Sequence, residues 1–249
     1  MSKQQIRHII EQHSQRDGLT ETGIKGVQLF QATSAIPCVP AVYEPCVIAI
    51  VSGAAAGIGR ATAHRLAEEG AKICLGDIDR TGAESCAADI RARGGEALPL
   101  ALDVAEEADW RRIINATVEH FGGLDILVNN AGIAFAAGLE ETTTEQWRRI
   151  MAVNVDSVFF GCKFALPAMR ESGGGAIVNI SSILGLVGSP VQAAYSATKG
   201  AVNQLTQSIA LQYARKKIRA NASRRFASLY KWSLTHVKLW KARDLMSIL

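Results

Sequence analysis

The 249-residue chain lacks most features of secreted, metal-binding and membrane proteins. Its five cysteines include no CxxC pair and no histidine lies beside them at ligand spacing, so we expect free thiols and no metal site. The first fifteen residues lack the apolar run of a secretory signal. The longest uncharged stretch, residues 172–198, is interrupted by glycine, proline and polar residues. We therefore expect a cytoplasmic protein with no membrane partner.

Acidic residues are scarce at the C-terminal end. Residues 214–249 hold ten of the 27 Lys and Arg but one of the 23 acids, so the net charge of +4 arises there. This end is either a poorly ordered terminus or a basic amphipathic segment that touches a membrane or nucleic acid. No recognition helix is evident, and we expect no nucleic-acid partner.

From residue 47 onward, short apolar runs alternate with longer helical stretches. Glycines follow four of the helices, as left-handed C-terminal caps require. The strands are apolar throughout, which indicates that both faces are covered. This rhythm predicts an α/β fold, a doubly wound parallel sheet. Strands are expected at 47–52, 72–77, 97–103, 125–129 and 176–181, and helices at 58–69, 81–93, 106–121, 144–171 and 193–215.

A glycine-rich turn, Ser52-Gly53-Ala54-Ala55-Ala56-Gly57-Ile58-Gly59, joins the first of these strands to the first helix. Strand, glycine turn and helix is the context of a dinucleotide site, because bare backbone and a helix N-terminus can receive a pyrophosphate. The alternative is a tight turn that binds nothing. Asp77 ends the next strand, eighteen positions after Gly59, where an acid can bind the adenosine ribose. A carboxylate there favours NAD over NADP, although Asp79 could take its place.

Three further residues could supply proton chemistry. Tyr195 and Lys199 are four positions apart and lie on one face of the expected helix, where an ammonium could stabilise a phenolate. Ser182 follows the fifth strand, at the sheet edge where such folds bind ligands. Alone, a tyrosine and a lysine at this spacing occur often by chance. The Asn129-Asn130-Ala131-Gly132 segment is equally well explained as a turn.

Together these segments resemble the short-chain dehydrogenase/reductase family over residues 46–222. The motifs occur in the family's order and at its spacing, although the family usually has Thr where Ser52 stands. Besides the glycine turn and Asp77 they are Leu102-Asp103-Val104, Asn129-Asn130-Ala131-Gly132, Val153-Asn154-Val155, Ser181-Ser182 and Tyr195-Ser196-Ala197-Thr198-Lys199.

The resemblance implies a Rossmann fold and an NAD(H)-dependent oxidoreductase that interconverts a secondary alcohol and a ketone. Tyr195 would exchange a proton with the substrate oxygen, and Ser182 would hydrogen-bond that oxygen. Lys199 would lower the pKa of Tyr195 and hold the nicotinamide ribose, and Asn154 would bind a water that links Lys199 to solvent. The resemblance also implies a homo-oligomer formed through the helices at 144–171 and 193–215.

The same resemblance implies the residues that hold NAD. The glycines would shape the pyrophosphate site, Asp103 would contact the adenine, and Asn129 would line the cofactor cleft. The implied cofactor-binding set is Ser52, Gly53, Gly57, Ile58, Gly59, Asp77, Asp103, Val104, Asn129, Ala131, Gly132, Tyr195 and Lys199.

Both ends of the chain depart from the family. After residue 222 the family has a Pro-Gly turn, a substrate-covering segment and a last strand. Here Ser223-Arg224-Arg225-Phe226 follows, so we expect the sixth strand to be shortened or lost and the seventh to be missing. Residues 1–45 form an extension, poorly ordered or a fused fragment, with a faint resemblance to AraC-type regulators from residue 26. Residues 223–249 form an atypical basic tail.

Two other functions remain open. The chain could be an inactive remnant that binds NAD weakly, because its C-terminal substrate region is replaced. It could also be a DNA-binding regulator, which the head and the basic tail suggest. The substrate is not specified, although Ile183, Leu184 and Val187 favour an apolar one.

Overall fold

The computed structural model describes residues 18–21, 28–31 and 46–223, and these form parts of two units, Met1–Glu44 and Pro45–Leu249. The first unit contains a two-stranded antiparallel sheet of β1 (Gly18–Glu21) and β2 (Gln28–Gln31), with Gly18 opposite Gln31. Most of the expected extension, with most of the AraC-like stretch, lies outside the described residues. So does the tail beyond Ser223.

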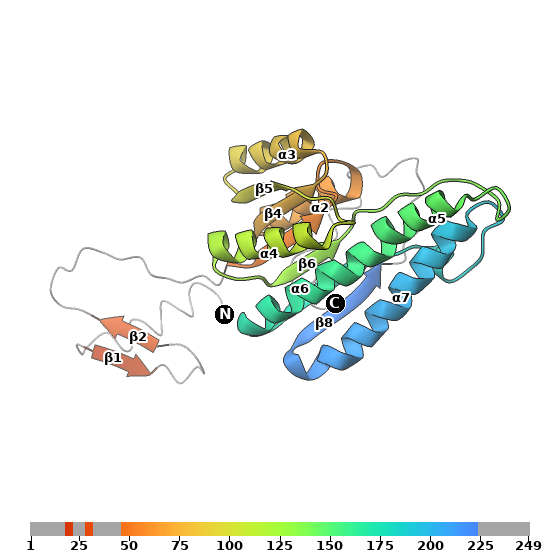
Figure 1. The fold of residues 1–249 in the computed structure, drawn as a ribbon. Coiled ribbons are helices and arrows are strands. Elements are labelled where there is room, and N and C mark those ends of the chain that lie inside the picture. Colours follow the sequence, from red (N-terminus) through yellow and green to blue (C-terminus); the bar gives the residue numbers. More distant parts are fainter. Residues whose placement is uncertain (1–17, 22–27, 32–45, 224–249) are drawn as a thin grey trace. The chain divides into compact units, whose positions relative to one another are not determined.

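The second unit is built on a six-stranded parallel sheet (Figure 1). The strand order is β5-β4-β3-β6-β7-β8. From β3 the chain adds β4 and β5 on one side, and it then returns to add β6, β7 and β8 on the other, so the order of strands reverses between β3 and β6. Ligands bind at such a reversal, outside the carboxyl ends of the strands. The strands are β3 (Ile48–Ser52), β4 (Lys72–Asp77), β5 (Ala97–Ala101), β6 (Ile126–Asn129), β7 (Gly175–Ile180) and β8 (Ile218–Ser223).

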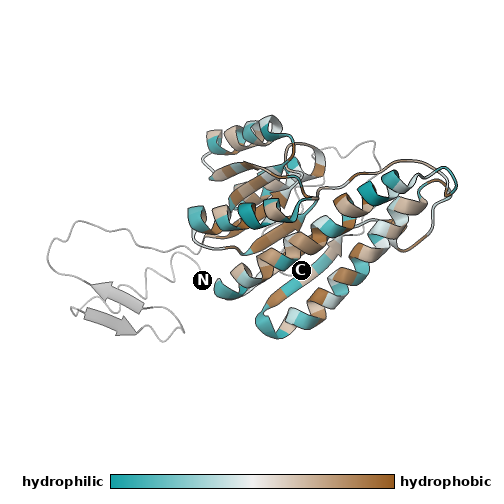
Figure 2. Cartoon of the chain, viewed as in Figure 1, coloured by the Kyte–Doolittle hydropathy of each residue, from teal (hydrophilic) through white to brown (hydrophobic). Residues whose placement is uncertain are grey.

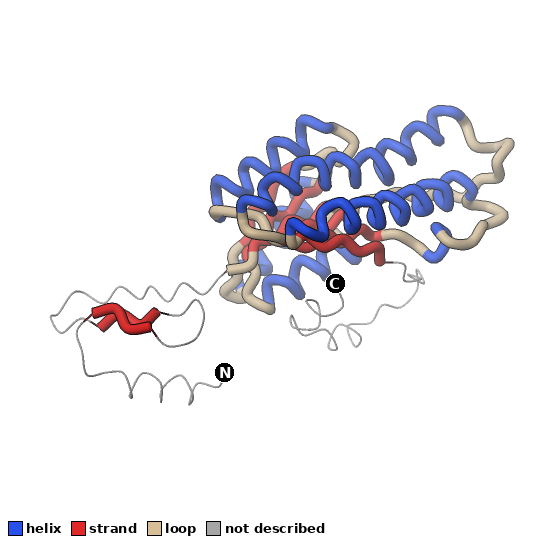
Figure 3. Tube along the Cα trace, turned by 90° about the horizontal axis from the view of Figure 1, so that it is seen from below, coloured by secondary structure: helices blue, strands red, loops and turns tan. Residues whose placement is uncertain are grey.

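Helices cover both faces of this sheet (Figure 3). One core cluster packs α2 (Gly57–Glu68) and α3 (Arg80–Ala92) against the sheet, and the second packs α4, α6 and α7 against the other face. The central strands β3 and β6 are buried along their whole length, and Figure 2 colours most of β6 as hydrophobic. The remaining helices are α4 (Glu107–Phe121), α5 (Thr144–Met151), α6 (Ser157–Glu171) and α7 (Ala193–Tyr213).

The expected helix ends are confirmed. Gly70, Gly94, Gly122 and Gly173 all have φ between 84° and 95°, the left-handed conformation that a glycine adopts without strain. The five expected strands and five expected helices occur within a few residues of their predicted bounds. Helices α5 and α6 form one continuous helix, joined by the π-helical turn η1 (Ala152–Asp156).

The expectation for the sixth strand was wrong. β8 has six residues and pairs with β7 along its full length, from Gly175–Ile218 to Ile180–Ser223. The family pattern breaks at Ser223, the last paired residue, so the break leaves the pairing of the edge strand in place. No seventh strand occurs in this sheet within the part of the chain that the structure describes.

One helix deserves comment because of its length. The continuous segment Thr144–Glu171 is long and apolar enough, by length and composition only, to cross a membrane, a property that we did not anticipate. Half of its apolar window is buried inside the domain. Val158, Cys162 and Met169 of α6 belong to the core, which accounts for the apolar character as packing against the sheet.

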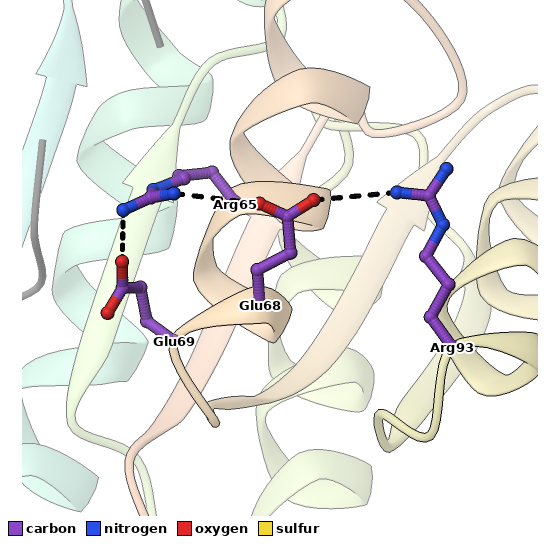
Figure 4. Close-up of polar contacts among 4 residues, drawn as sticks. All are labelled: Arg65, Glu68, Glu69 and Arg93. Atoms are coloured by element: carbon purple, nitrogen blue, oxygen red, sulfur yellow. Dashed lines mark hydrogen bonds and ion pairs between the residues drawn. The ribbon is translucent and has the colours of Figure 1, made fainter. Parts of the chain in front are cut away.

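Ion pairs join the ends of α2 and α3 that lie away from the glycine turn (Figure 4). Arg65 pairs with Glu68 at 3.6 Å and with Glu69, and Glu68 also pairs with Arg93 at 3.4 Å. Glu68 and Arg93 have exposed side chains, so the pair between them contributes less than about 1 kcal/mol to stability.

Candidate active site

The glycine turn between β3 and α2 has the conformation that a close backbone approach requires. Gly53 and Gly57 have φ of 66° and 56°. A Cβ on Gly59 would lie 2.0 Å from the carbonyl oxygen of Gly53, so the turn can close only around a glycine. The helix N-cap Ala56 offers no side-chain cap to the first N–H groups of α2. These donors at the positive end of the helix dipole suit an anion such as pyrophosphate.

Two polar side chains hold the turn against β6. The buried Ser52 hydroxyl donates to Val128 O and accepts hydrogen bonds from the backbone N–H groups of Asn130 and Ala131. The Asn130 amide donates to Ser52 O at 2.9 Å and to Gly53 O at 3.1 Å. Asn130 was absent from our expected site, yet it fixes the glycine turn at the reversal point of the sheet.

Asp77 reaches the turn from the end of β4. Its Oδ2 accepts a hydrogen bond of 2.8 Å from Ala55 N, and its Oδ1 accepts one from Asp79 N. Asp79 instead caps α3 by accepting from Gly82 N at 3.0 Å. Of the two acids, the structure therefore places Asp77 at the glycine turn. Arg60, which we did not anticipate, donates to Ala55 O and pairs with Asp89 at 2.6 Å.

The remaining residues expected at the adenine end lie around the same edge. Asp103 accepts a hydrogen bond from Ala105 N at 3.0 Å and so shapes the loop after β5. Val104 is buried in the core, where its carbonyl accepts from the Trp110 indole. Ile58 is exposed on the first turn of α2.

Asn129 does not line the cleft that we expected. Its side chain is 3% exposed and donates to Asn179 Oδ1 at 2.8 Å and to Cys162 Sγ. Asn179 continues this buried network to Thr206 on α7. Adjacent strand residues point to opposite faces, so Asn129 enters the core while Asn130 reaches the glycine turn.

Asn154 and Lys199 meet beside Gly132. A Cβ on Gly132 would lie 3.3 Å from Asn154 Oδ1 and 3.7 Å from Lys199 Nζ. Asn154 is buried in the π-helical turn, where its amide bonds both backbone groups of Ile133 and donates to Thr198 Oγ1. π-helical turns often mark functional sites in helices.

Ser182, Tyr195 and Lys199 come together at the adjoining edge. Ser182 starts the short helix η2 (Ile183–Gly185) and accepts a hydrogen bond from Leu184 N. The ammonium of Lys199 lies 5.5 Å from the centroid of the Tyr195 ring and donates to Ile180 O at 2.7 Å. Tyr195 and Lys199 therefore share one face of α7, as expected.

The pKa values of this group differ from our expectation. Burial raises the pKa of Tyr195 above its usual value, and a hydrogen bond with the Ser182 side chain lowers it by less. The Lys199 ammonium lies over the ring and donates its hydrogen bond to Ile180 O. Burial also lowers the pKa of Lys199 to about 8.

These residues fit a dinucleotide. The backbone approach at Gly53 and Gly59 leaves no room for side chains, and nothing lies within 4 Å of a Cβ placed on Gly57. Each oxygen of the Asp77 carboxylate accepts one backbone hydrogen bond, so further acceptor sites remain for ribose hydroxyls. Within the described residues no group of three His, Cys, Asp or Glu side chains could hold a metal ion.

Comparison with known proteins agrees with this geometry. The short chain dehydrogenase family model matches residues 47–224. A 2,5-dichloro-2,5-cyclohexadiene-1,4-diol dehydrogenase of Sphingobium indicum is 44% identical over 174 residues, which are 70% of each chain. An NADP-dependent (R)-specific alcohol dehydrogenase of Lentilactobacillus kefiri is 42% identical over 68% of this chain and 67% of its own. The crystal structure of a 3-ketoacyl-ACP reductase from Sinorhizobium meliloti has 38% identity and a TM-score of 0.69 over 70% of each chain.

The chain therefore belongs to the short-chain dehydrogenase/reductase family of oxidoreductases. The Rossmann fold agrees with that membership and with the sheet topology.

Proposed function

We propose that this protein interconverts a secondary alcohol and a ketone with NAD(H), and that Tyr195 is the acid/base. The observation that carries the proposal is that the side chains of Ser182, Tyr195 and Lys199 lie together at one edge of the sheet. Ser182 lies close enough to the Tyr195 side chain to lower its pKa, and the Lys199 ammonium lies over the same ring. This cluster adjoins Gly132, three residues beyond Asn129 at the end of β6 and close to the glycine turn.

The chain's own residues would handle the proton. The bound nicotinamide supplies or accepts the hydride. In ketone reduction, the Tyr195 phenol donates its proton to the substrate oxygen, and the Ser182 hydroxyl donates a hydrogen bond to the same oxygen. In alcohol oxidation, the phenolate accepts the hydroxyl proton. Lys199 would hold the nicotinamide ribose, and Asn154 would bind the water that links Lys199 to solvent.

We favour NAD over NADP because of charge at the ribose end. The Asp77 carboxylate, fixed by Ala55 N, would repel a 2′-phosphate. Arg60 is the nearby cation, but its guanidinium is engaged by Asp89. A relative named as NADP-dependent makes this a specific point to test.

The substrate side supports a small uncharged alcohol. The segments next to the site, residues 131–139 and 183–192, contain no charged residue. Leu139, Leu186, Val187 and Val191 are exposed there. A relative is named for a cyclic diol, so we propose an apolar, cyclic secondary alcohol as the first substrate to try.

We further propose a cytoplasmic homo-oligomer. Exposed Trp147, Phe159 and Leu211 on α5, α6 and α7 support association through these helices.

The test is turnover with a panel of cyclic and linear secondary alcohols, each with NAD and with NADP, beside titration of the protein with NADH. Turnover of at least one alcohol supports the proposal. Binding of NADH without any turnover would favour the inactive remnant instead. If the protein neither binds NADH nor turns over any alcohol, both the proposed activity and the inactive remnant are rejected.

A further inference from the structure

The short helix η2, which carries the catalytic-site serine at its start, contacts α7 at an unusually close point. Gly185 is the last residue of η2. A Cβ placed there would lie 2.6 Å from Asn203 Nδ2 and 2.6 Å from Lys199 O. One of these atoms belongs to the backbone of α7, so it cannot move without moving the helix. The position therefore requires glycine, because any Cβ would clash with α7.

Two hydrogen bonds fix the same junction. The Asn203 amide, on a residue only 4% exposed, donates to Gly185 O at 3.1 Å. The Ser181 hydroxyl donates to Lys199 O at 3.1 Å. Ser182 is therefore enclosed between Ser181 and Gly185, both of which are tied to α7.

Asn203 lies on the functional face of α7. It follows Lys199 by four residues and Tyr195 by eight, and residues at this spacing share one helix face. The backbone group that Asn203 holds belongs to the turn that Ser182 begins. A change at Asn203 is thus transmitted to Ser182 through one hydrogen bond and three residues.

We propose that Gly185 and Asn203 are positioning residues that set the distance between the Ser182 hydroxyl and the Tyr195 phenol. The inference rests on the proposed function, because it assigns these residues to the same reaction. Neither residue touches the reacting atoms. Their effect passes through the seating of η2 on α7.

The expected consequence has a distinct pH signature. Among the described residues, the groups that face the phenol are Ser182 at the start of η2 and Lys199 from the next turn of α7. Ser182 favours the phenolate by its hydrogen bond, whereas Lys199 keeps its own bond to Ile180 on β7. Loosening η2 removes the Ser182 contribution and raises the pKa of Tyr195 further.

The first experiment compares Gly185→Ala with Gly188→Ala, three residues later in the same loop. A Cβ on Gly188 meets nothing within 4 Å, and its φ does not lie in the left-handed region. We expect Gly185→Ala to lower kcat by about a hundredfold, the cost of a displacement near 1 Å. The dissociation constant for NADH should stay unchanged, because the glycine turn and Asp77 lie on other strands. Gly188→Ala should match the wild type in both.

The second experiment removes the hydrogen bond without adding bulk to η2. Asn203→Leu is compared with Gln204→Leu, whose site is the next, exposed position of α7. We expect Asn203→Leu to lower kcat and to move the acidic limb of the kcat profile for alcohol oxidation to higher pH, because the phenol must lose its proton to act as the base. Equal profiles for the two variants would overturn the proposal, as would a loss confined to NADH binding.

A final readout does not depend on turnover. The pKa of Tyr195 can be measured in the cofactor-free protein by ring-¹³C NMR, with its signal assigned by its loss in Tyr195→Phe. Higher pKa values in Gly185→Ala and Asn203→Leu than in the two controls support the proposal even if no substrate is turned over. Unchanged values overturn it, whatever the outcome of the activity panel.

Discussion

Lys199 holds its ammonium nitrogen 5.5 Å from the centroid of the Tyr195 ring while it donates a hydrogen bond of 2.7 Å to Ile180 O. The lysine is thereby tied to the end of β7 and not to the phenol oxygen. It is 5% exposed, and burial lowers its pKa to about 8. The site thus contains a cation that can lose its charge in mildly alkaline solution.

The first prediction concerns this lysine. Because its pKa falls from 10.5 to about 8 on folding, the unfolded chain binds the proton more tightly between these values. The free energy of unfolding should therefore rise with pH from about 8 to 10.5, by up to about 3 kcal/mol, at 1.36 kcal/mol per pKa unit. Below pH 8 the penalty is constant. Urea unfolding of the wild type and Lys199→Met across this range measures the difference, and parallel curves would contradict it.

The second prediction concerns cofactor choice. Asp77→Asn removes the carboxylate beside Ala55 and should raise the affinity for NADPH relative to NADH about tenfold, or 1.4 kcal/mol. Asp79→Asn is the control, since asparagine also caps helices well and Asp79 bonds Gly82. Fluorescence titration with both reduced cofactors gives the ratio. A larger change of the NADPH/NADH affinity ratio in the Asp79 variant would contradict the prediction, because Asp79 and not Asp77 would then contact the ribose.

The third prediction concerns the glycine turn. Gly59→Ala would place a Cβ 2.0 Å from Gly53 O, so the turn must open and NADH affinity should fall more than tenfold. Gly70→Ala, at the other end of α2, strains a φ of 89° but meets no neighbour within 4 Å. It should cost about 1 kcal/mol of stability and leave NADH binding intact. If both variants bind NADH equally, the turn is not the cofactor site.

The fourth prediction concerns the buried network below the site. Thr206→Val leaves the Asn179 amide without its acceptor at 2.9 Å and should cost about 1–3 kcal/mol of stability. Ser208→Ala removes an exposed hydroxyl bonded to Gln204 O and should change stability by less than about 0.5 kcal/mol. Urea unfolding distinguishes them, and equal costs would show that the network does not stabilise the fold.

Much of this architecture could be predicted, because local patterns specify it. The glycine turn, Asp77 and the left-handed caps at Gly70 and Gly122 each follow from a short stretch of sequence. The expectation for β8 was wrong because the pairing of Ile218–Ser223 with β7 depends on contacts between distant segments, which the break after residue 222 does not reveal. A break in a family pattern says nothing about strand pairing that is already complete.

The details of the site required contacts between distant segments. Adjacent asparagines at 129 and 130 have the same local chemistry, and the way that β6 is set in the sheet decides which one enters the core. The spacing of Tyr195 and Lys199 predicts a shared face but not their burial, which moves both pKa values. The need for glycine at 185 depends on atoms of Lys199 and Asn203, which lie on α7 14 and 18 residues further along the chain. Residues 224–249 lie outside the described part, so the predicted departure at the nicotinamide stays a prediction.

The most direct measurement compares alcohol oxidation by Tyr195→Phe and Tyr213→Phe, which lie on one helix and each lose one hydroxyl. The account predicts that Tyr195→Phe loses at least about a hundredfold in kcat while its NADH affinity stays within twofold. Tyr213→Phe should keep wild-type activity. Wild-type turnover in Tyr195→Phe would contradict the account, because the proton would then be carried by another group.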